Sequence, residues 1–260
     1  MFSDSLELYI TADHECPYIR DRKATNLLVD PGYCMDATTY ARLIDKGFRR
    51  SGSDVYRPCC YRCQSCISTR IPVHQFKPKR SQRRNWKRNR DLKVQISTSG
   101  FKPEYTELYL KYIHSRHAGG GMDEDTPASF ASFILTSWCE TVLLEFWQDE
   151  RLLGVAATDR LAQGLSAVYT FFDPEQGAER GLGVYALLWQ LDWAKRLGLS
   201  YVYPGYWIAE SPKMNYKVRF RPISGYINDR WVELPEYREP VKTAGETSTR
   251  QSTRVSPVVW

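Results

Sequence analysis

The sequence predicts an α+β fold in which a small cysteine-rich N-terminal domain precedes a larger domain of helices and antiparallel strands. Three observations support this prediction. Four of the seven cysteines lie within residues 59–66, and from about residue 100 the apolar residues alternate between helical and strand periods. After residue 235 the composition shifts to Thr, Ser, Glu and Arg, with few large apolar residues. We therefore expect domains at residues 1–95 and 96–235, followed by a disordered tail at 236–260.

The N-terminal part is predicted to contain short elements around its cysteines. Residues 6–10 are expected to form a strand. Residues 36–46 are expected to form a helix that Thr38 caps, because three apolar residues in it share one face. A strand at residues 70–73 follows the cysteines, and a basic helix at 82–90 comes next.

The C-terminal part alternates helices with a run of three strands. Apolar residues between 103 and 117 recur at i, i+3, i+4, i+7 and i+8, which is the period of an amphipathic helix. Short polar turns separate three strand-like runs, which indicates an antiparallel meander. The expected elements are helices at 103–117 and 128–137, strands at 141–147, 152–158 and 166–172, a helix at 184–197 and a strand at 200–206. This order resembles the GNAT acyltransferase fold, which indicates acyl transfer by analogy alone.

Length, charge and cysteine count narrow the class of protein. The 260 residues contain no apolar run near the roughly 20 residues that span a bilayer, and residues 1–10 lack the basic start of a secretory signal. An odd number of cysteines without a secretory signal argues against a disulfide framework. We therefore expect a cytoplasmic monomer that does not bind membranes.

Positive charge is concentrated between Lys77 and Lys93, where nine Lys and Arg residues face a single acid, Asp91. A run of one sign attracts a polyanion because each phosphate contact releases counterions, so we predict a nucleic-acid partner. The alternative is a solvated helix face, although such faces usually interleave both signs. Trp86 within the run can stack on a base or pack inward, and the sequence leaves both possibilities open.

The sharpest local signal is the spacing Cys60-x2-Cys63-x2-Cys66, with Cys59 adjacent and Cys16 upstream. Thiolates two residues apart can converge on one soft metal ion, so we predict Cys16, Cys60, Cys63 and Cys66 as ligands, with Cys59 in reserve. Zinc and an iron–sulfur cluster both stay open, because three closely spaced cysteines also suit a cluster, although the residues after Cys66 do not continue the bacterial ferredoxin pattern. The other interpretation is a set of buried, unliganded thiols.

The glycine-rich turn that begins at Arg180 bears on whether the protein binds coenzyme A. GNAT enzymes that use acetyl-CoA cradle its pyrophosphate on such a turn, at the start of the helix after the meander. Here Arg180-Gly-Leu-Gly183 comes close, but Tyr185 stands where the backbone must approach phosphate. The turn therefore weakens the case for a coenzyme A site, and the alternative is that its glycines serve helix–strand packing.

Eight segments carry a resemblance that extends from about Cys16 to Trp231. They are Glu15-Cys16-Pro-Tyr18; Gly47-Phe-Arg-Arg-Ser-Gly52; Tyr56-Arg-Pro-Cys-Cys60-x2-Cys63-x2-Cys66-x3-Arg70-Ile; Phe76-x-Pro78-x-Arg80-Ser-Gln-Arg-Arg84; Tyr112-Ile-x2-Arg116-His117; Leu165-Ser-Ala-Val-Tyr-Thr-Phe171; Gly205-Tyr-Trp-Ile208; and Lys213-Met-Asn-Tyr-Lys217. Together they resemble the arginyl-tRNA–protein transferase family, most closely its bacterial branch, the aspartate/glutamate leucyltransferases. The chain departs from the family pattern at Cys59, Ser211 and residues 123–125.

The resemblance implies the reaction and its co-substrate, an aminoacyl-tRNA. The α-amino group of a protein that begins with Asp or Glu attacks the ester carbonyl, a peptide bond forms and the tRNA leaves. The product is then degraded by the N-degron route. Because the ester is already activated, positioning and oxyanion stabilisation are the enzyme's main tasks. The bacterial branch implies leucine as the donor amino acid, and the wider family implies arginine.

The matching segments also supply the candidate site residues. Tyr216 and Lys217 are predicted as the catalytic residues. The carboxylate of the acceptor calls for an arginine, whose planar fork can hold both oxygens, and Arg50 or Arg70 is preferred over Arg49 for this role. The other predicted substrate-binding residues are Gly205, Tyr206 and Lys213, together with Arg80, Arg83, Arg84 and Lys87 for the tRNA phosphates.

Two other classes of protein stay open. A GNAT N-acetyltransferase would retain acetyl-CoA and ignore charged tRNA. A non-catalytic, metal-stabilised RNA-binding module would bind charged and uncharged tRNA equally well and form no product.

Overall fold

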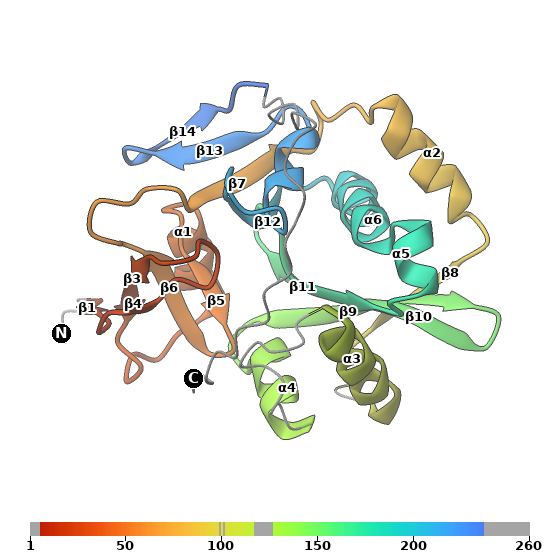
Figure 1. Ribbon diagram of the computed structural model, residues 1–260, viewed down its shortest axis with the longest axis horizontal. Coiled ribbons are helices and arrows are strands. Elements are labelled where there is room, and N and C mark those ends of the chain that lie inside the picture. Colours follow the sequence, from red (N-terminus) through yellow and green to blue (C-terminus); the bar gives the residue numbers. More distant parts are fainter. Residues whose placement is uncertain (1–5, 99, 101, 117–126, 237–260) are drawn as a thin grey trace, which may run out of the picture.

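The computed structural model describes residues 6–98, 100, 102–116 and 127–236 of the chain (Figure 1). The predicted tail, apart from Glu236, lies outside these ranges, as do His117 and residues 123–125. The described part is a mixed α/β structure with an eight-stranded, a four-stranded and a two-stranded sheet. Within these ranges, no helix combines the length and the apolar character that crossing a membrane requires.

Fourteen strands, six α-helices and one 3-10 helix make up the described ranges. The first part of the chain forms β1 (Leu8–Ile10), β2 (His14–Glu15), β3 (Lys23–Ala24), β4 (Asn26–Val29), α1 (Ala37–Ile44), β5 (Arg49–Ser51), β6 (Asp54–Pro58), β7 (Ile67–Pro72), α2 (Arg80–Arg88) and β8 (Lys93–Ser97). The second part forms α3 (Pro103–Arg116), α4 (Pro127–Ile134), β9 (Glu140–Gln148), β10 (Arg151–Leu161), β11 (Gly164–Phe172), α5 (Gln176–Arg180), α6 (Leu182–Arg196), β12 (Tyr201–Trp207), the 3-10 helix η1 (Asn215–Arg219), β13 (Ser224–Ile227) and β14 (Arg230–Glu233).

The large sheet has the strand order β14-β13-β7-β12-β11-β10-β9-β8. Neighbouring strands are antiparallel except β11 and β12, which are parallel. Figure 1 shows α3 and α4 on one side of this sheet and α6, with α2 packed on it, on the other. Both faces are therefore buried. Val155, Ala156 and Ala157 of β10 are all 0% exposed, although consecutive residues of a strand point to opposite faces.

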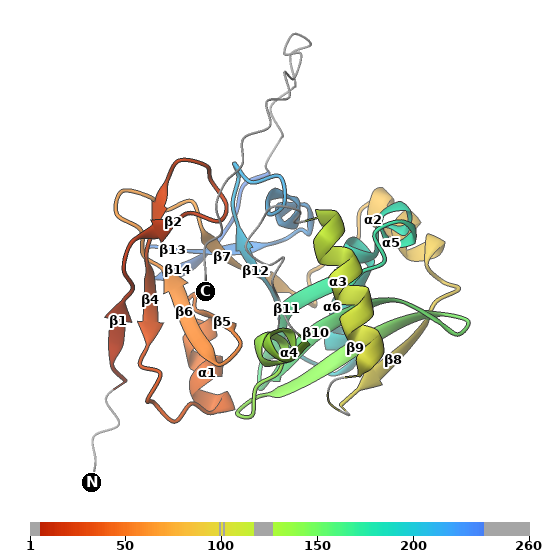
Figure 2. The same ribbon diagram turned by 60° about the horizontal axis from the view of Figure 1, so that its bottom comes forward.

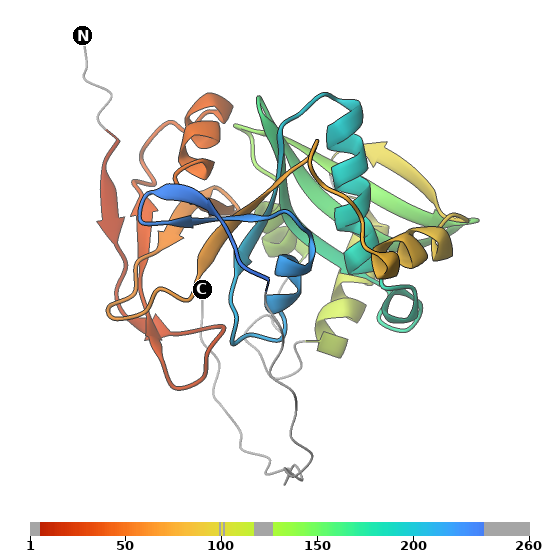
Figure 3. The ribbon, with the colours of Figure 1, turned by 90° about the horizontal axis from the view of Figure 1, so that it is seen from above.

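Strand β7 belongs to the large sheet, although it lies within the predicted N-terminal domain, residues 1–95. It pairs with β12 on one side and with β13 on the other. Figure 3 shows the β13–β14 hairpin alongside it. Strand β8, from the end of the same predicted domain, pairs with β9 at the far edge. The large sheet therefore contains strands from both predicted domains.

The four-stranded sheet has the order β1-β4-β6-β5 and stands at one end of the molecule (Figure 2). Its core is a second hydrophobic cluster, in which Tyr40 and Ile44 of α1 and Val55 of β6 lie with Leu161 and Tyr203 of the large sheet. The two sheets thus share buried side chains, and β5 is held against the large sheet.

Most predicted elements agree with the structure in type. The meander is confirmed as β9–β11, and the predicted helices and strands correspond to α1, α2, α3, α4, α6, β1, β7 and β12. The helix cap was wrongly predicted: Asp36, not Thr38, caps α1, because its side chain accepts a hydrogen bond from the Thr39 amide at 2.7 Å. Patterning misses elements that are only two to five residues long, too short to show a period: β2, β3, β4, β5, β6, β8, β13, β14, α5 and η1.

Candidate active site

Strands β11 and β12 separate at the candidate site. They pair only from Gly164 and Tyr201 to Ser166 and Tyr203. Just beyond, Pro204 has no N–H for a ladder bond and Gly205 takes a φ of +94°, and the β12–β7 pairing shifts register there. The part of β12 beyond Tyr203 is therefore not paired with β11, and side chains from η1 reach its backbone.

Lys217 of η1 is the side chain that reaches this backbone. Its Nζ donates a hydrogen bond to the Tyr206 carbonyl at 2.7 Å and lies 3.5 Å from Met214 Sδ. The residue is 5% exposed, and in the part of the chain that the structure describes it has no acidic partner. Burial and, to a smaller extent, the nearby charge of Arg49 together lower the pKa of Lys217 to about 7. The amine is thus close to the protonation balance that suits a general base.

Arg49 of β5 is a second buried cation beside Lys217. It is 6% exposed, and its Nη2 donates to the Thr69 carbonyl at 3.1 Å. Its Nε and Nη1 are buried and have no hydrogen-bond partner. Its guanidinium carbon lies 5.6 Å from the centre of the Tyr203 ring. Burial lowers the pKa of Arg49, but the guanidinium starts from so high a value that it keeps its charge.

Three tyrosines complete the surroundings of the two cations. Burial raises the pKa values of Tyr18, Tyr56 and Tyr206, so all three phenols stay protonated near neutral pH. The hydroxyl of Tyr206 donates to the carbonyls of Gly47 and Tyr56, both at 3.3 Å. The centre therefore offers cations and neutral phenols, and it has the character of a site for an anion.

The predicted residues Gly205, Tyr206 and Tyr216 lie around Lys217. A Cβ at Gly205 would stand 3.4 Å from Lys217 Nζ, so a larger side chain there would cover the amine. The Gly205 carbonyl accepts a hydrogen bond from Thr69 Oγ1 at 2.6 Å. The centre of the half-buried Tyr216 ring lies 6.0 Å from Lys217 Nζ. Lys213, by contrast, is exposed on the loop before η1.

The four predicted metal ligands lie near one another and next to this centre. Burial, together with smaller electrostatic effects of Cys16, Cys60 and Cys63, raises the pKa of Cys66 to about 12. Cys63 differs, because hydrogen bonds from the Ser65 backbone and from Arg22 lower its pKa. Within the described ranges, no group of three or more Cys, His, Asp or Glu residues is arranged so that it could hold a metal ion.

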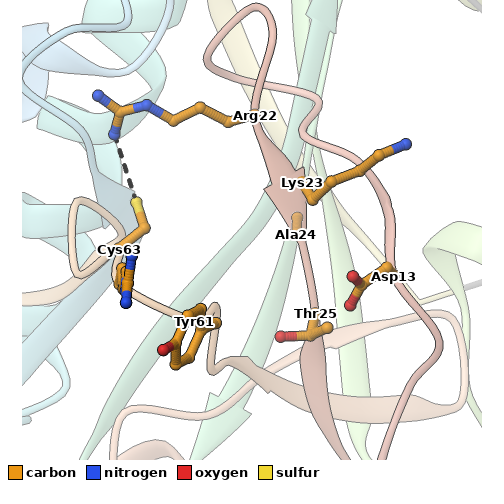
Figure 4. A pocket seen from close by; sticks show the side chains of 8 residues that line it. Asp13, Arg22, Lys23, Ala24, Thr25, Tyr61 and Cys63 are labelled. Carbon is orange, nitrogen blue, oxygen red and sulfur yellow. Dashed lines mark hydrogen bonds between the residues drawn. The ribbon is translucent and has the colours of Figure 1, made fainter.

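A pocket opens on the outer side of the cysteine loop. In Figure 4 the Arg22 side chain points at the Cys63 sulfur, and Tyr61 lies below them. Tyr61 is 83% exposed, and Arg62 stacks over its ring with a carbon-to-centroid distance of 4.9 Å. The lining residues are Asp13, Arg22, Lys23, Ala24, Thr25, Tyr61, Arg62 and Cys63.

Arg50, a preferred candidate for reading the acceptor, is committed to internal partners. Its side chain is 0% exposed and grips Asp159 with two hydrogen bonds of 2.7 Å, from Nε and Nη2. Its remaining donors reach the carbonyls of Gly52 and Ile134 and the hydroxyl of Thr141. This arrangement favours a structural role, since Arg50 ties β5 to β10 and to the end of α4.

Arg70, the other preferred candidate, is held between two rings. Its guanidinium carbon lies 4.1 Å from the centre of the Tyr201 ring and 4.3 Å from that of Trp231. Its Nη1 pairs with Asp45 at 3.2 Å. The Arg70 charge is therefore neutralised within the fold and faces aromatic surface.

The predicted tRNA-binding residues lie on the exposed side of α2. Arg80, Arg83, Arg84 and Lys87 are all exposed. Trp86 faces the opposite way and packs on Tyr185 of α6, with ring centres 5.4 Å apart. The structure thus places Trp86 inward and leaves the basic residues on the surface.

Helix α2 also covers the glycine-rich turn before α6. Asn85 Nδ2 donates to the carbonyls of Arg180 and Gly181, at 2.9 and 3.1 Å. Gly181 has a φ of +65°, and a Cβ there would lie 2.7 Å from Asn85 Nδ2. Glycine is therefore required at 181 by close helix packing, which is the alternative to a pyrophosphate cradle.

The structure thus brings together Lys217, Tyr206, Gly205 and Cys66, whereas Arg50 faces Asp159 and the basic side chains of α2 lie on the surface. Tyr18 and Tyr56 are parts of the centre that sequence reasoning did not single out. Both stand in segments that carry the family resemblance, next to Cys16 and the cysteine cluster. The family resemblance of those segments was the sequence signal that could have identified Tyr18 and Tyr56.

Comparison with known proteins gives two family matches. Residues 14–84 match the model described as Arginine-tRNA-protein transferase, N terminus. Residues 104–227 match the model described as Arginine-tRNA-protein transferase, C terminus. The two matches include β5, β7, β12 and η1 in full, and the N-terminal match ends within α2.

Curated relatives match over nearly their full lengths. A protein of Nitrosococcus oceani named aspartate/glutamate leucyltransferase is 47% identical over 233 residues, which are 89% of this chain and 98% of that protein. Proteins with the same name in Hahella chejuensis and Pseudomonas fluorescens are 46% and 48% identical, over 88% of this chain and 98% and 97% of their own. Among solved structures, L-PGS from Bacillus licheniformis has a TM-score of 0.41 at 10% identity, over 56% of this chain and 48% of that one.

Proposed function

The chain belongs to the arginine-tRNA–protein transferase family, and on that premise we propose that it transfers leucine from leucyl-tRNA to an N-terminal Asp or Glu. The relatives at 46–48% identity, matched over almost their whole lengths, carry the name of this activity. The protein that receives leucine then becomes a substrate of N-degron degradation. The observation that carries the chemistry is Lys217, a buried amine without an acidic partner in the described part of the chain.

Lys217 and Tyr216 are the catalytic residues of this proposal. The acceptor's amine attacks the ester carbonyl carbon, so a C–N bond forms and the C–O bond to the tRNA ribose breaks. One proton must pass from the attacking nitrogen to the departing ribose oxygen. Neutral Lys217 can accept that proton and return it, because with a pKa of about 7 both its neutral and its protonated forms are accessible near neutral pH. Gly205 and Tyr206 supply the backbone along which the aminoacyl group lies.

The residues 96–235 are proposed to be GNAT-like. The antiparallel meander β9–β11, the following helix α6 and the parallel strand β12 support this proposal. So does the separation of β11 from β12 beyond Tyr203, next to Lys217. Acetyl-CoA is not part of the proposal, because Asn85 of α2 occupies the glycine-rich turn.

The exposed face of α2 is proposed to bind the tRNA backbone. Arg80, Arg84 and Lys87 are exposed and positive, and α2 is anchored to α6 by its opposite face. A rigid helix that presents one sign of charge suits phosphate binding. Since charged tRNA is the donor, we also propose that the protein acts in the cytoplasm, as a monomer.

The cysteine cluster is proposed to hold zinc or an iron–sulfur cluster through Cys16, Cys60, Cys63 and Cys66. Thiol donors suit a soft cation, and the effects of Cys16, Cys60 and Cys63 on the pKa of Cys66 support a grouping around it, although in the described ranges the four are not arranged as a preformed metal site. A bound metal centre would pin the loop before β7 and contribute folding energy. Elemental analysis of protein purified without oxygen tests this, and a metal-free, fully active protein would exclude it.

A transfer assay tests the proposed function directly. The protein is mixed with labelled leucyl-tRNA or arginyl-tRNA and with peptides that begin with Asp, Glu, Lys or Ala. We expect leucine on the Asp and Glu peptides alone. Transfer of arginine instead of leucine would identify arginyl-tRNA as the donor. If no amino acid is transferred and charged and uncharged tRNA bind equally well, the protein is an RNA-binding module.

A further inference from the structure

Arg49 is a buried guanidinium that no acid in the described part of the chain neutralises. It is 6% exposed, and of its nitrogens only Nη2 has a hydrogen-bond partner, the Thr69 carbonyl. An ion inside a protein without a counter-charge is strongly unfavourable, because it has lost its hydration and gained no partner charge. A buried, unneutralised charge is expected at a functional site, where a bound ligand of opposite charge compensates it.

The surroundings of Arg49 add to its attraction for an anion. Thr69 links Arg49 to the backbone beside Lys217: its carbonyl accepts from Arg49 and its hydroxyl donates to the Gly205 carbonyl. A Cβ at Gly205 would stand 3.4 Å from Lys217 Nζ, so an amine that can carry a second positive charge lies close to the guanidinium. The phenols of Tyr56 and Tyr206 are near enough to interact electrostatically with Arg49. No acid from β5, β6, β7, β12 or η1 is paired with either cation in the described ranges.

Arg50 and Arg70, the neighbouring arginines, are both neutralised by an acid. Arg50 is neutralised by Asp159 through two hydrogen bonds of 2.7 Å. Arg70 has one unpartnered nitrogen, Nε, but Asp45 neutralises its charge and two rings sandwich its guanidinium. Of the three arginines that flank the cysteine cluster, Arg49 is the one with both an uncompensated charge and unused donors.

We propose, on the premise of the proposed function, that Arg49 binds the side-chain carboxylate of the acceptor's N-terminal Asp or Glu. Its unused Nε and Nη1 are donors for carboxylate oxygens. In Asp or Glu the carboxylate and the α-amino group are a few bonds apart, so a carboxylate on Arg49 brings the amine to Lys217. Arg49 then binds the side chain of the acceptor's N-terminal residue, and Lys217 accepts the proton from the α-amino group of that same residue.

This arrangement also explains refusal of the uncharged analogues. An N-terminal Asn or Gln has nearly the same shape as Asp or Glu, but it cannot neutralise Arg49. A site built around a buried charge discriminates strongly against a ligand that leaves the charge unpaired. Arg49 is therefore a specificity residue, whereas Lys217 acts on the reacting amine.

The test compares full-length wild type with Arg49→Gln, Arg49→Lys and the control Arg57→Gln. Arg57 lies on the adjoining strand β6, partly exposed, with Asp229 3.7 Å away. Two readouts are taken with peptides that begin with Asp, Asn, Glu or Gln: kcat/KM for leucine transfer, and peptide affinity measured by calorimetry without tRNA. Thermal unfolding and the affinity for leucyl-tRNA are measured for every variant.

For Arg49→Gln we expect kcat/KM with Asp and Glu peptides to fall about 100-fold, and the Asp-to-Asn and Glu-to-Gln ratios to approach one. Affinity for leucyl-tRNA should stay unchanged. Arg49→Lys should recover less than about a tenth of the lost activity, because the fork of donors is missing. Arg57→Gln should keep the wild-type ratios.

Wild-type ratios in a folded Arg49→Gln variant would overturn the inference and leave the proposed function intact. If Gln at 49 unfolds the chain, Arg49→Lys decides, because full retention of the Asp-to-Asn ratio and of rate would also overturn it. If the wild type transfers nothing, the proposed function fails. The calorimetric Asp-to-Asn ratio still decides whether Arg49 reads the carboxylate.

Discussion

Lys217 and Arg49 place two cations inside the molecule, whereas the neighbouring Arg50 is neutralised by Asp159. A buried ion pair can serve structure alone, but buried cations without an acid in the described part of the chain lower its stability. The same burial that costs stability makes the Lys217 amine neutral near pH 7 and therefore able to accept a proton.

Replacing Lys217 with Met is expected to stabilise the fold and to abolish transfer. In the unfolded chain the lysine keeps its proton up to its ordinary pKa of 10.5, but in the folded protein it loses the proton above about 7. Between these values the unfolded chain binds more protons, so wild-type stability rises with pH from about 7 to about 10.5. Lys217→Met should remove this slope and add ~1–4 kcal/mol at pH 7.

Activity and a matched control complete this test. Wild-type transfer should rise as pH increases through about 7, as Lys217 becomes neutral, and Lys217→Met should be slower by ~100- to 10,000-fold. Lys195→Met, at an exposed lysine of α6, should leave rate and stability slope unchanged. Denaturant titrations across pH give the slope. A less stable or still active Lys217→Met protein would contradict this account.

The sequence could not separate Arg49 from Arg50. The two are adjacent in the segment from Gly47 to Gly52, and strand alternation sends their side chains to opposite faces. In the described ranges Arg50 faces an acid and Arg49 does not, and this difference depends on Asp159, which lies 109 residues after Arg50 in the chain. Lys217 stands in another segment that carries the family resemblance, and there Tyr216 and Val218 flank it, so no adjacent residue of the same type competes with it.

At the scale of elements, α2 shows what composition can and cannot predict. Its density of charge correctly predicts an exposed basic helix. The two asparagines that anchor it, Asn85 and Asn89, carry no such signal, although both donate to the Arg180 carbonyl. Their role depends on a turn more than 90 residues away in sequence, and it is visible only in the folded chain.

Reversing two charges on α2 is expected to weaken tRNA binding. The variant Arg84→Glu/Lys87→Glu changes exposed residues and leaves the contacts of Asn85 and Trp86 in place. Affinity should fall, and the slope of log K against log salt should become shallower by about 1–2, since fewer counterions are released. Filter binding of leucyl-tRNA between low and physiological salt measures both.

The control for α2 is Lys195→Glu/Arg230→Glu, which makes the same change in net charge at exposed positions of α6 and β14. If the two double variants lose affinity equally, long-range charge explains the effect and α2 is no binding surface. Transfer with saturating tRNA should be near wild type for both variants, because neither changes the Lys217 centre.

At the scale of the whole molecule, the large sheet joins the two predicted domains. The sequence placed a boundary at about residue 95 because cysteine content and charge change there. It gave no sign that β7 inserts between β12 and β13, since that pairing links residues 67–72 to residues 201–207 and 224–227. Pairing between such distant segments leaves no local pattern. The proposed catalytic centre depends on it, because Arg49 reaches β7 and Lys217 reaches β12.

Fragments 1–95 and 96–260 are therefore expected not to fold when each is expressed alone. Without β7, strands β12 and β13 lose the strand between them, and the core loses Ile71, which is 0% exposed. Without the second fragment, α1 loses Leu161 and Tyr203 from its hydrophobic cluster. The intact chain should unfold in a single cooperative transition, whereas each fragment should show poorly dispersed amide resonances and no transition in guanidinium.

A chain that ends at residue 236 serves as the control and should keep the wild-type midpoint, because the tail is predicted to be disordered. If residues 96–260 alone give a cooperative transition, the second part is an autonomous domain, and β7 is an addition to a sheet that is stable without it.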